Sequence, residues 1–375
     1  MRIVVTGGGT GGHIYPALAF IKYLQTVETE LDVLYIGTHK GLESKIVPEV
    51  GIAFAEIEVQ SIRRSLSPSN IRTAWLLATS IGKAKKILRD FKPDIVLGTG
   101  GYVSGPVLLA ALQLKLPTII HEQNSYPGVT NRYLGKRVSR VATAMKAANS
   151  YFPADKVVFT GNPRAQEVAE MQRKRLSADG ADSVLTELGL SADKQTVVIF
   201  GGSRGALTIN QAVVASLSKL AAMDIQTIYA SGEIYFDDYA AEFAKVADAK
   251  NIVIKPYISN MSEILASSDL FLGRSGATTI AEITALGLPA IFIPSPNVVA
   301  DHQTKNAQAL VDAGAAVLIA DAELNADSLI QNISEITSDA LKYNQMAAAS
   351  RAAGVPDASE RLYHLVGEVL SERRQ

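Results

Sequence analysis

Short apolar runs alternate along the chain with longer segments in which apolar residues recur at helical spacing. Uninterrupted runs of this length are typical of parallel strands that are buried on both faces. They occupy residues 2–5, 33–37, 54–59, 94–98, 118–122, 138–142 and 157–160, and then 196–200, 227–230, 252–254, 269–273, 290–293 and 316–319. The alternation predicts an α/β fold built from doubly wound parallel sheets.

The pattern restarts near the middle of the chain. A Gly-Asn-Pro turn at 161–163 and a polar, charged stretch at 171–183 predict a break. The strand at 196–200 then leads through a glycine-rich turn into a helix, as the first strand does. We therefore expect two Rossmann-like domains. Their predicted bounds are 1–162 and 163–355, and a C-terminal helix within 356–375 is expected to cross back to the first domain.

Composition narrows the class of protein. A chain of 375 residues is long for one core, which agrees with two domains. Hydrophobic content of 47%, charged content of 19% and a net charge of −1 argue against a general nucleic-acid binder. Without cysteine there are no disulfides, thiol nucleophiles or cysteine-bound metals. We see no signal peptide and no apolar run of about 18 residues, so we expect a cytoplasmic protein with at most peripheral membrane contact.

The first strand runs into five glycines within seven residues. Residues 7–13 read Gly-Gly-Gly-Thr-Gly-Gly-His, and a helical pattern follows. Glycine lets main-chain N–H groups come close to a ligand, and a helix N-terminus adds partial positive charge. The stretch therefore suits an anionic, phosphate-bearing ligand, although it is neither the usual dinucleotide fingerprint nor a P-loop. A tight turn that only packs is the alternative.

Further polar clusters follow other predicted strands, where ligands bind in open α/β sheets. They are His13, residues 102–104, residues 121–124, residues 203–204 and residues 274–279. In the last cluster a small-residue turn leads into a helix that carries Glu282, whose carboxylate can accept two hydrogen bonds from a sugar diol. Its alternative role is to complement the helix dipole. With two Rossmann-like domains, we expect these strand ends to face one cleft.

Six motifs in this order carry a family resemblance: Gly-Gly-Thr-Gly-Gly-His at 8–13, Gly-Thr-Gly-Gly-Tyr-Val-Ser-Gly-Pro at 98–106, His-Glu-Gln-Asn at 121–124, Gly-Asn-Pro at 161–163, Gly-Gly-Ser-x-Gly-Ala at 201–206 and Arg-Ser-Gly-Ala-x-Thr-x-x-Glu at 274–282. The chain resembles the MurG family, the UDP-N-acetylglucosamine (UDP-GlcNAc) transferases of peptidoglycan synthesis, over nearly its whole length. The Ser-Pro-Asn at 295–297 and the following His-Gln at 302–303 are similar to Gram-positive members.

The resemblance implies a GT-B fold, with parallel sheets that face each other across a cleft. It implies an inverting transfer of GlcNAc from UDP-GlcNAc to the C4 hydroxyl of N-acetylmuramic acid (MurNAc) in lipid I, the undecaprenyl-pyrophosphoryl MurNAc-pentapeptide. The products are lipid II and UDP. This step belongs to cell-wall biogenesis and so bears on cell shape and division. Beyond the two substrates, the resemblance suggests divisome or elongasome proteins as partners, and no nucleic acid.

The resemblance also assigns the donor site. Ile258 meets uracil through its backbone, Glu282 binds the ribose diol, and Gln303 contacts the sugar hydroxyls. The full set of donor contacts is Thr10, Gly11, Gly12, Asn124, Arg164, Ser203, Ile258, Ala277, Thr278, Thr279, Glu282 and Gln303. The family usually has glutamine before Gln303, where this chain has His302. Since the sequence contains no Asp-x-Asp, we expect no required cofactor and no metal site. UDP is then stabilised by helix N-termini and Arg164, and Mg²⁺ would act only as a non-specific stimulant.

The acceptor contacts that we expect are Gly9, Thr10, His13, Tyr102, Ser104 and His121. His13 is the candidate base, because imidazole titrates near neutrality. Its alternative role is to shape the loop or to bind the lipid diphosphate. Glu122 is the weaker candidate base, and a structural histidine is the favoured reading of His121.

A run of basic residues between Arg63 and Arg89 contains no acid. On a helix, Arg72, Lys83 and Lys86 share a face flanked by Trp75 and Leu76, as in helices that bind anionic lipid. A solvated face over a core helix is the alternative. The lipid-linked acceptor favours peripheral binding at the cytoplasmic side of the cell membrane.

Two rival functions remain. One is another GT-B UDP-sugar transferase that acts on a glycolipid, against which the motif at 98–106 argues. The other is a non-catalytic nucleotide-sugar binding module, against which polar clusters in both domains argue. A dehydrogenase is disfavoured, because no usual dinucleotide fingerprint with an acid after the second strand is present.

Overall fold

The computed structural model describes residues 1–59, 69–177, 183–202 and 204–374, with the backbone alone over 69–75 and 176–177 and at 183, 299 and 374. The chain forms two units. Unit 1 comprises Met1–Arg164 and Asp357–Gln375, and unit 2 comprises Ala165–Pro356.

Unit 1 is built on a parallel sheet of seven strands in the order β3-β2-β1-β4-β5-β6-β7. The strands are β1 (Arg2–Gly7), β2 (Asp32–Thr38), β3 (Ala53–Ile57), β4 (Ile95–Gly100), β5 (Thr118–Glu122), β6 (Arg140–Thr143) and β7 (Val157–Phe159). Its helices are α1 (Gly11–Val27), α2 (Glu43–Glu49), α3 (Ser69–Phe91), α4 (Ser104–Gln113), α5 (Val129–Leu134), the 3₁₀ turn Lys146–Tyr151 and α16 (Ala358–Arg374).

Both faces of this sheet are covered, because side chains alternate along each strand. On β1, Ile3 and Val5 pack in one core with α1 and α16, while Val4 packs in the other with α3 and α4. The short apolar runs are therefore strands with two buried faces, as predicted.

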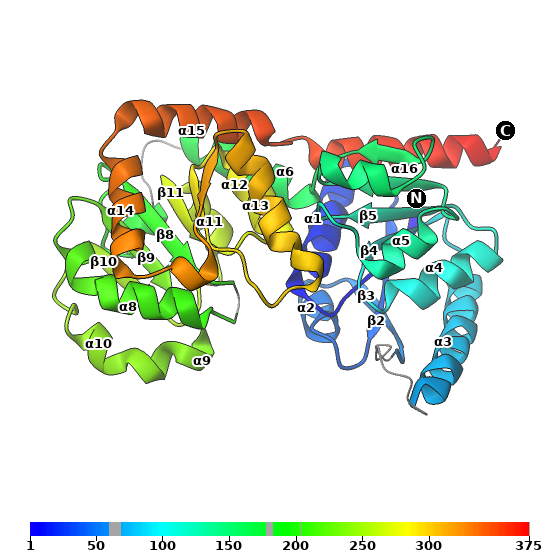
Figure 1. The fold of residues 1–375 in the computed structure, drawn as a ribbon. Coiled ribbons are helices and arrows are strands. Elements are labelled where there is room, and N and C mark those ends of the chain that lie inside the picture. The colour runs from blue at the N-terminus through cyan, green and yellow to red at the C-terminus, as the bar shows by residue number, and fades with distance from the viewer. Residues whose placement is uncertain (60–68, 178–182, 203, 375) are drawn as a thin grey trace. The chain divides into compact units, whose positions relative to one another are not determined.

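Helix α16 supplies part of the first of these cores. Leu362, Leu365, Val366 and Val369 recur at helical spacing and are at most 3% exposed. The Tyr363 hydroxyl donates to Glu28 Oε1 at 2.7 Å, just beyond the end of α1. Figure 1 shows α16 in red over the blue α1 within unit 1. The last segment of the chain thus completes the core of the first unit.

Unit 2 has a parallel sheet of six strands in the order β10-β9-β8-β11-β12-β13. The strands are β8 (Thr196–Phe200), β9 (Gln226–Ala230), β10 (Ile252–Lys255), β11 (Leu270–Gly273), β12 (Ala290–Phe292) and β13 (Ala316–Leu318). The helices are α6 (Pro163–Ser177, which begins in unit 1), α7 (Ser183–Glu187), α8 (Leu207–Ala221), α9 (Glu233–Phe236), α10 (Ala240–Ala244), α11 (Met261–Ala266), α12 (Ala277–Leu286), α13 (His302–Asp312), α14 (Ala326–Thr337) and α15 (Ala340–Ala353), with 3₁₀ turns at Asp237–Tyr239, Val299–Asp301 and Asp321–Glu323.

The first segment of unit 1 ends at Arg164, beside the Gly-Asn-Pro turn where the sequence predicts a break. The polar residues that follow are helical as far as Ser177, because Pro163 opens helix α6. Proline suits the first helical position, where its missing N–H costs nothing. The Asn162 side chain accepts from the Arg164 N–H at 3.1 Å, as a helix cap does. Polar residues then continue the helix, with a Gln166–Glu170 hydrogen bond of 3.0 Å one turn apart. Residues 178–182 lie outside the described ranges.

Candidate active site

The strand order of each sheet reverses at one point, between β1 and β4 in unit 1 and between β8 and β11 in unit 2. Ligands of open α/β sheets bind at such switch points, beyond the carboxyl ends of the strands. The glycine-rich turns of the sequence follow these four strands. Topology therefore singles out one candidate site in each unit.

In unit 1 the turns after β1 and β4 touch each other. The Gly8 N–H donates to Gly100 O at 3.2 Å. Gly101 has a φ of 82°, and a Cβ there would lie 2.2 Å from Gly8 O, so only glycine fits. The two turns form one rigid surface at the start of α1.

His13 lies in the first turn of α1 with its ring fixed against this surface. Its Nδ1 is 3.0 Å from Gly8 O and 3.3 Å from Thr10 Oγ1, and the Thr99 hydroxyl donates to His13 O at 2.8 Å. A carbonyl oxygen can only accept, so Nδ1 carries the proton and Nε2 has the lone pair. The nitrogen that can take up a proton is thus defined by the backbone.

Glu43, on α2, is a site residue that the sequence analysis missed. Its carboxylate is fully buried, with Oε1 accepting from the Thr38 N–H at 3.0 Å and the Thr38 hydroxyl at 2.6 Å. Oε2 accepts from the Gly9 N–H at 3.0 Å. Burial opposes ionisation, but these hydrogen bonds outweigh it and lower the pKa of Glu43. In the sequence it looks like any acid at a helix start, because its donors are Thr38 at the end of β2 and Gly9 in the turn after β1.

Unit 2 presents two helix N-termini at its switch point, those of α8 and α12. The capping residues Ala206 and Gly276 make no side-chain cap hydrogen bond. The first-turn N–H groups therefore lack the usual side-chain acceptor, which is the arrangement of an anion site. In the described part of the chain, Thr278 Oγ1 is buried without a hydrogen-bond partner.

A partly buried ion pair stabilises these ends. Arg274 Nη1 donates to Ile293 O and Pro294 O, each at 3.0 Å, and pairs with Asp321 Oδ1. Asp321 Oδ2 accepts from the Thr208 hydroxyl at 2.9 Å. These contacts connect the ends of β11 and β12 to the first turn of α8. The positive charge of Arg274 is neutralised by Asp321.

A model of the glycosyltransferase family 28 N-terminal domain matches residues 3–143, and a model of the glycosyltransferase family 28 C-terminal domain matches residues 196–362. The chain belongs to glycosyltransferase family 28.

Similar proteins agree along nearly the full length. One from Lactococcus lactis subsp. cremoris is 59% identical over 98% of this chain and 99% of its own, and one from Bacillus licheniformis is 50% identical over the same shares. Both are named UDP-N-acetylglucosamine–N-acetylmuramyl-(pentapeptide) pyrophosphoryl-undecaprenol N-acetylglucosamine transferase. The crystal structure of Acinetobacter baumannii MurG has a TM-score of 0.74 and 29% identity, over 98% of this chain and 99% of that one. The predicted fold class, two Rossmann-like units of the GT-B type, is confirmed.

Two predicted acceptor contacts of this family 28 chain need correction, because both side chains are fully buried. Ser104 donates to Gly101 O at 2.9 Å and so holds the second turn. His121 Nε2 lies 2.9 Å from Gly161 O, and its Nδ1 lies 3.1 Å from Gln123 Nε2. Burial lowers the pKa of His121 to about 4, so its ring is neutral. His121 is thus the structural histidine that the sequence analysis favoured.

Glu122 is also a structural residue and not a candidate base. It is 2% exposed. Oε1 accepts from the Asn124 N–H at 3.0 Å, and Oε2 accepts from the Gly128 N–H at 3.0 Å and from Asn131 Nδ2 at 2.8 Å. With donors on both oxygens, the carboxylate shapes the loop after β5 and is not placed to take a substrate proton.

Several predicted donor contacts lie together in unit 2. The Ser275 hydroxyl donates to Gln303 O at 2.8 Å, which joins the turn before α12 to the first turn of α13. The Gln303 side chain accepts from the Ser295 N–H at 2.8 Å, so its amide is oriented. Glu282 lies on α12 and is 7% exposed. Ala277, Thr278 and Thr279 form the first turn of α12.

Other predicted contacts lie elsewhere. Ile258 follows β10 and is largely buried, and Ser203 lies outside the described residues. In unit 1 the Arg164 guanidinium stacks over the Tyr15 ring at 5.8 Å. Gly9, Thr10 and Gly12 are exposed on the first turn, with Gly11 half-buried, and Tyr102 is 63% exposed after the second turn. Asn124 is half-buried in the loop after β5.

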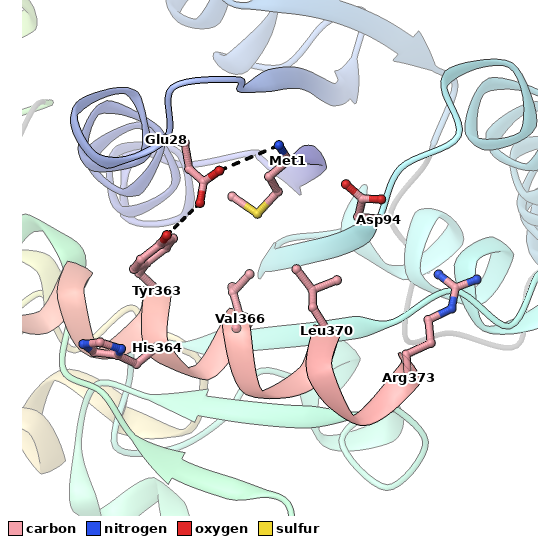
Figure 2. Close-up of a pocket in the computed structure, with 9 residues that line it drawn as sticks. Met1, Glu28, Asp94, Tyr363, His364, Val366, Leu370 and Arg373 are labelled. Carbon is pink, nitrogen blue, oxygen red and sulfur yellow. Dashed lines mark hydrogen bonds and ion pairs between the residues drawn. The ribbon is translucent and has the colours of Figure 1, made fainter. Parts of the chain in front are cut away.

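Two cavities of unit 1 lie at opposite ends of its sheet. One of about 750 Å³, shown in Figure 2, is lined by Met1, Glu28, Tyr363 and Arg373 at the amino-terminal ends of the strands. The other, of about 530 Å³, lies beside Gly9 at the carboxyl ends. The second has the position expected of a ligand site.

The predicted membrane contact of Leu76, on helix α3, is wrong. Leu76 is 7% exposed and shares a buried stripe with Ala84 and Leu88, so it serves the core. Lys83 and Lys86 are exposed, while the side chains of Arg72 and Trp75 lie outside the description. Across the ranges that the structure describes, no helix has the length and apolarity to cross a bilayer.

Proposed function

We propose that this chain transfers GlcNAc from UDP-GlcNAc to the C4 hydroxyl of MurNAc in undecaprenyl-pyrophosphoryl MurNAc-pentapeptide. The products are lipid II and UDP, and the step belongs to cell-wall peptidoglycan synthesis. The observation that carries this proposal is the similarity, up to 59% identity over 98% of the chain, to enzymes named for this donor and this acceptor. The chain is then an inverting hexosyltransferase.

Unit 2 is proposed to bind the donor. The open N-termini of α8 and α12 can neutralise a diphosphate with main-chain N–H groups, and the unpartnered Thr278 hydroxyl adds a donor there. Glu282 accepts hydrogen bonds from the ribose diol, and the oriented amide of Gln303 contacts the sugar. Ile258, Ser203, Arg164 and Asn124 remain proposed contacts from the family resemblance.

Unit 1 is proposed to bind the acceptor beside Gly9, Thr10 and Tyr102. His13 Nε2 takes the proton of the C4 hydroxyl as its oxygen forms a bond to C1 of GlcNAc. The bond from C1 to the phosphate oxygen breaks on the opposite side, and UDP leaves with the electron pair. The defined Nδ1–H tautomer supports His13 in this role.

We also propose that the exposed Lys83 and Lys86 of α3 attract anionic lipid, so that the enzyme works at the cytoplasmic surface of the membrane where its lipid-linked acceptor lies.

The test is transfer with purified chain, UDP-GlcNAc and a lipid I analogue, followed by UDP release and by the mass of the lipid product. The expected result is a product heavier by one GlcNAc and UDP release that requires the analogue. Transfer to a diglucosyl lipid instead would favour another glycolipid enzyme. Donor binding without UDP release would favour a binding module. Competition among UDP-sugars then defines the donor.

A further inference from the structure

One peptide group connects the buried Glu43 to the imidazole of His13. The carbonyl of Gly8 lies 3.0 Å from His13 Nδ1, and the N–H of Gly9, which belongs to the same peptide group, donates to Glu43 Oε2 at 3.0 Å. We propose that Glu43 is a positioning residue that acts on His13 through the Gly8–Gly9 peptide. This inference rests on the proposed function, in which His13 is the base.

The physical effect follows from the polarity of the amide. A carboxylate that accepts from the N–H of Gly9 draws negative charge toward the Gly8 carbonyl oxygen. That oxygen then accepts more strongly from His13 Nδ1–H and favours the imidazolium that forms when Nε2 takes a proton. In a Ser-His-Asp triad an aspartate contacts the imidazole directly and does the same work. Here a peptide group stands between the two side chains.

Packing keeps the connection in register. A Cβ at Gly8 would lie 2.4 Å from Glu43 Cδ, so the carboxylate fills the space directly under the turn. Thr38 donates twice to Oε1, which leaves Oε2 directed at Gly9. We call the path from Glu43 through the Gly8–Gly9 peptide to His13 the relay. Neither the carboxylate of Glu43 nor the ring of His13 can rotate without losing a hydrogen bond.

The neighbouring ionisable groups do not replace this carboxylate. Around Glu43 they are Tyr35, His39 with its partner Glu56 at 3.1 Å, and the exposed Lys40 and Lys45. The charge of Glu43 adds to burial in raising the pKa of Tyr35, whose hydroxyl donates to Gly7 O at 2.8 Å.

The side-chain amide of Asn131 lies close to Gly100, on which the His13 ring also packs, and donates to the carboxylate of Glu122. Arg164 stacks on Tyr15 of α1, and the neutral His121 is buried behind the turn. In the described structure, Glu43 is thus the carboxylate that accepts from the Gly8–Gly9 peptide.

The deciding experiment is a double-mutant cycle of Glu43→Gln and His13→Ala, with kcat measured for GlcNAc transfer to the lipid I analogue. A glutamine would keep its oxygen on the two Thr38 donors and turn its NH₂ toward Gly9, so it breaks the relay at that contact. Glu43→Gln should lower kcat about tenfold or more and leave the KM for UDP-GlcNAc within about twofold. In the His13→Ala background the same change should have less than about twofold effect. An equal loss in both backgrounds would overturn the proposal.

The pH profile and a matched control separate this role from a merely structural one. Loss of the carboxylate charge should move the acidic limb of the kcat profile to lower pH, because the imidazolium is less favoured. Glu56→Gln, an exposed acid on the same side of the sheet, should leave both kcat and the profile unchanged. An acidic limb that stays in place in Glu43→Gln would contradict the relay.

A readout without turnover distinguishes failure of this inference from failure of the proposed function. Imidazole ¹⁵N spectra of the whole chain should show His13 as the Nδ1–H tautomer, with an Nδ1 signal that shifts in Glu43→Gln. If Glu43→Gln does not fold, the spectra are measured on Thr38→Val instead. This variant retains the Glu43 carboxylate and should therefore preserve the Nδ1–H tautomer of His13. An Nε2–H tautomer in the unmodified protein would exclude the relay, even if no acceptor were ever turned over.

Discussion

The glycine turns after β1 and β8 share one strand–turn–helix design but differ in the charge that holds them. In unit 1 the N–H groups of Gly8 and Gly9 are taken by Gly100 and by the buried anion of Glu43. In unit 2 the charged group near the start of α8 is Arg274, which pairs with Asp321, and Asp321 accepts from Thr208 in the first turn of α8. A buried carboxylate disfavours a second anion nearby. The same strand–turn–helix pattern therefore carries the proposed base in unit 1 and the proposed diphosphate site in unit 2.

The sharpest way to break this comparison is His13→Ala. Because a positioned general base contributes about 10²- to 10⁴-fold, turnover should fall roughly a thousandfold, while the affinity for UDP-GlcNAc should stay within about twofold. Steady-state kinetics and calorimetric donor binding measure the two quantities. Near-normal turnover would remove His13 as the base and leave the unit 1 turn as a packing element.

Acid should destabilise unit 1 through His121. His121 has a pKa of about 4 in the folded protein, below the ordinary 6.5, so the unfolded chain binds a proton first as the pH falls. The free energy of unfolding should drop by about 3 kcal/mol between about pH 6.5 and 4. Urea titrations can follow Trp75, the one tryptophan of the chain, which belongs to unit 1. His121→Gln should flatten this dependence, and an unchanged slope would argue against a neutral, buried ring.

The corresponding test of unit 2 is Glu282→Ala. Loss of a carboxylate that accepts from the ribose diol should raise the donor KM about 10- to 30-fold, equivalent to about 1.5–2 kcal/mol, and leave kcat at saturation much less affected. Gln331→Ala, on the exposed surface of α14, is a suitable control. An unchanged donor KM would show that Glu282 does not bind the ribose.

The smallest expected effect concerns α3. Lys83→Gln with Lys86→Gln should weaken co-sedimentation with anionic vesicles by about 1 kcal/mol per residue, roughly fivefold each, without changing binding to neutral vesicles. Binding that is independent of anionic lipid would place the membrane contact elsewhere.

Sequence pattern predicted the strands well, because runs such as 94–98 and 196–200 are apolar on both faces and have no competing interpretation. It missed the helix at Pro163–Ser177, because the polar stretch from residue 171 suggested part of a break, although Pro163 and Asn162 begin a helix. In the site it found the turns but not the function of each side chain. His121, Glu122 and Ser104 look like ligand groups in the sequence, yet each is satisfied internally. Glu43, in contrast, looks unremarkable in the sequence, because its burial and its hydrogen bonds to Gly9 and Thr38 arise only in the folded chain.

The return of α16 to unit 1 has a consequence for biosynthesis. Unit 2 is continuous in sequence from Ala165 to Pro356, so all of its residues emerge from the ribosome before Leu362 and Val366 do. Domains fold as units during synthesis, and the later domain can here finish first. The sheet that carries His13 acquires the core residues of α16 only after the whole of unit 2 has been synthesised, so unit 1 can be completed only after unit 2 has emerged.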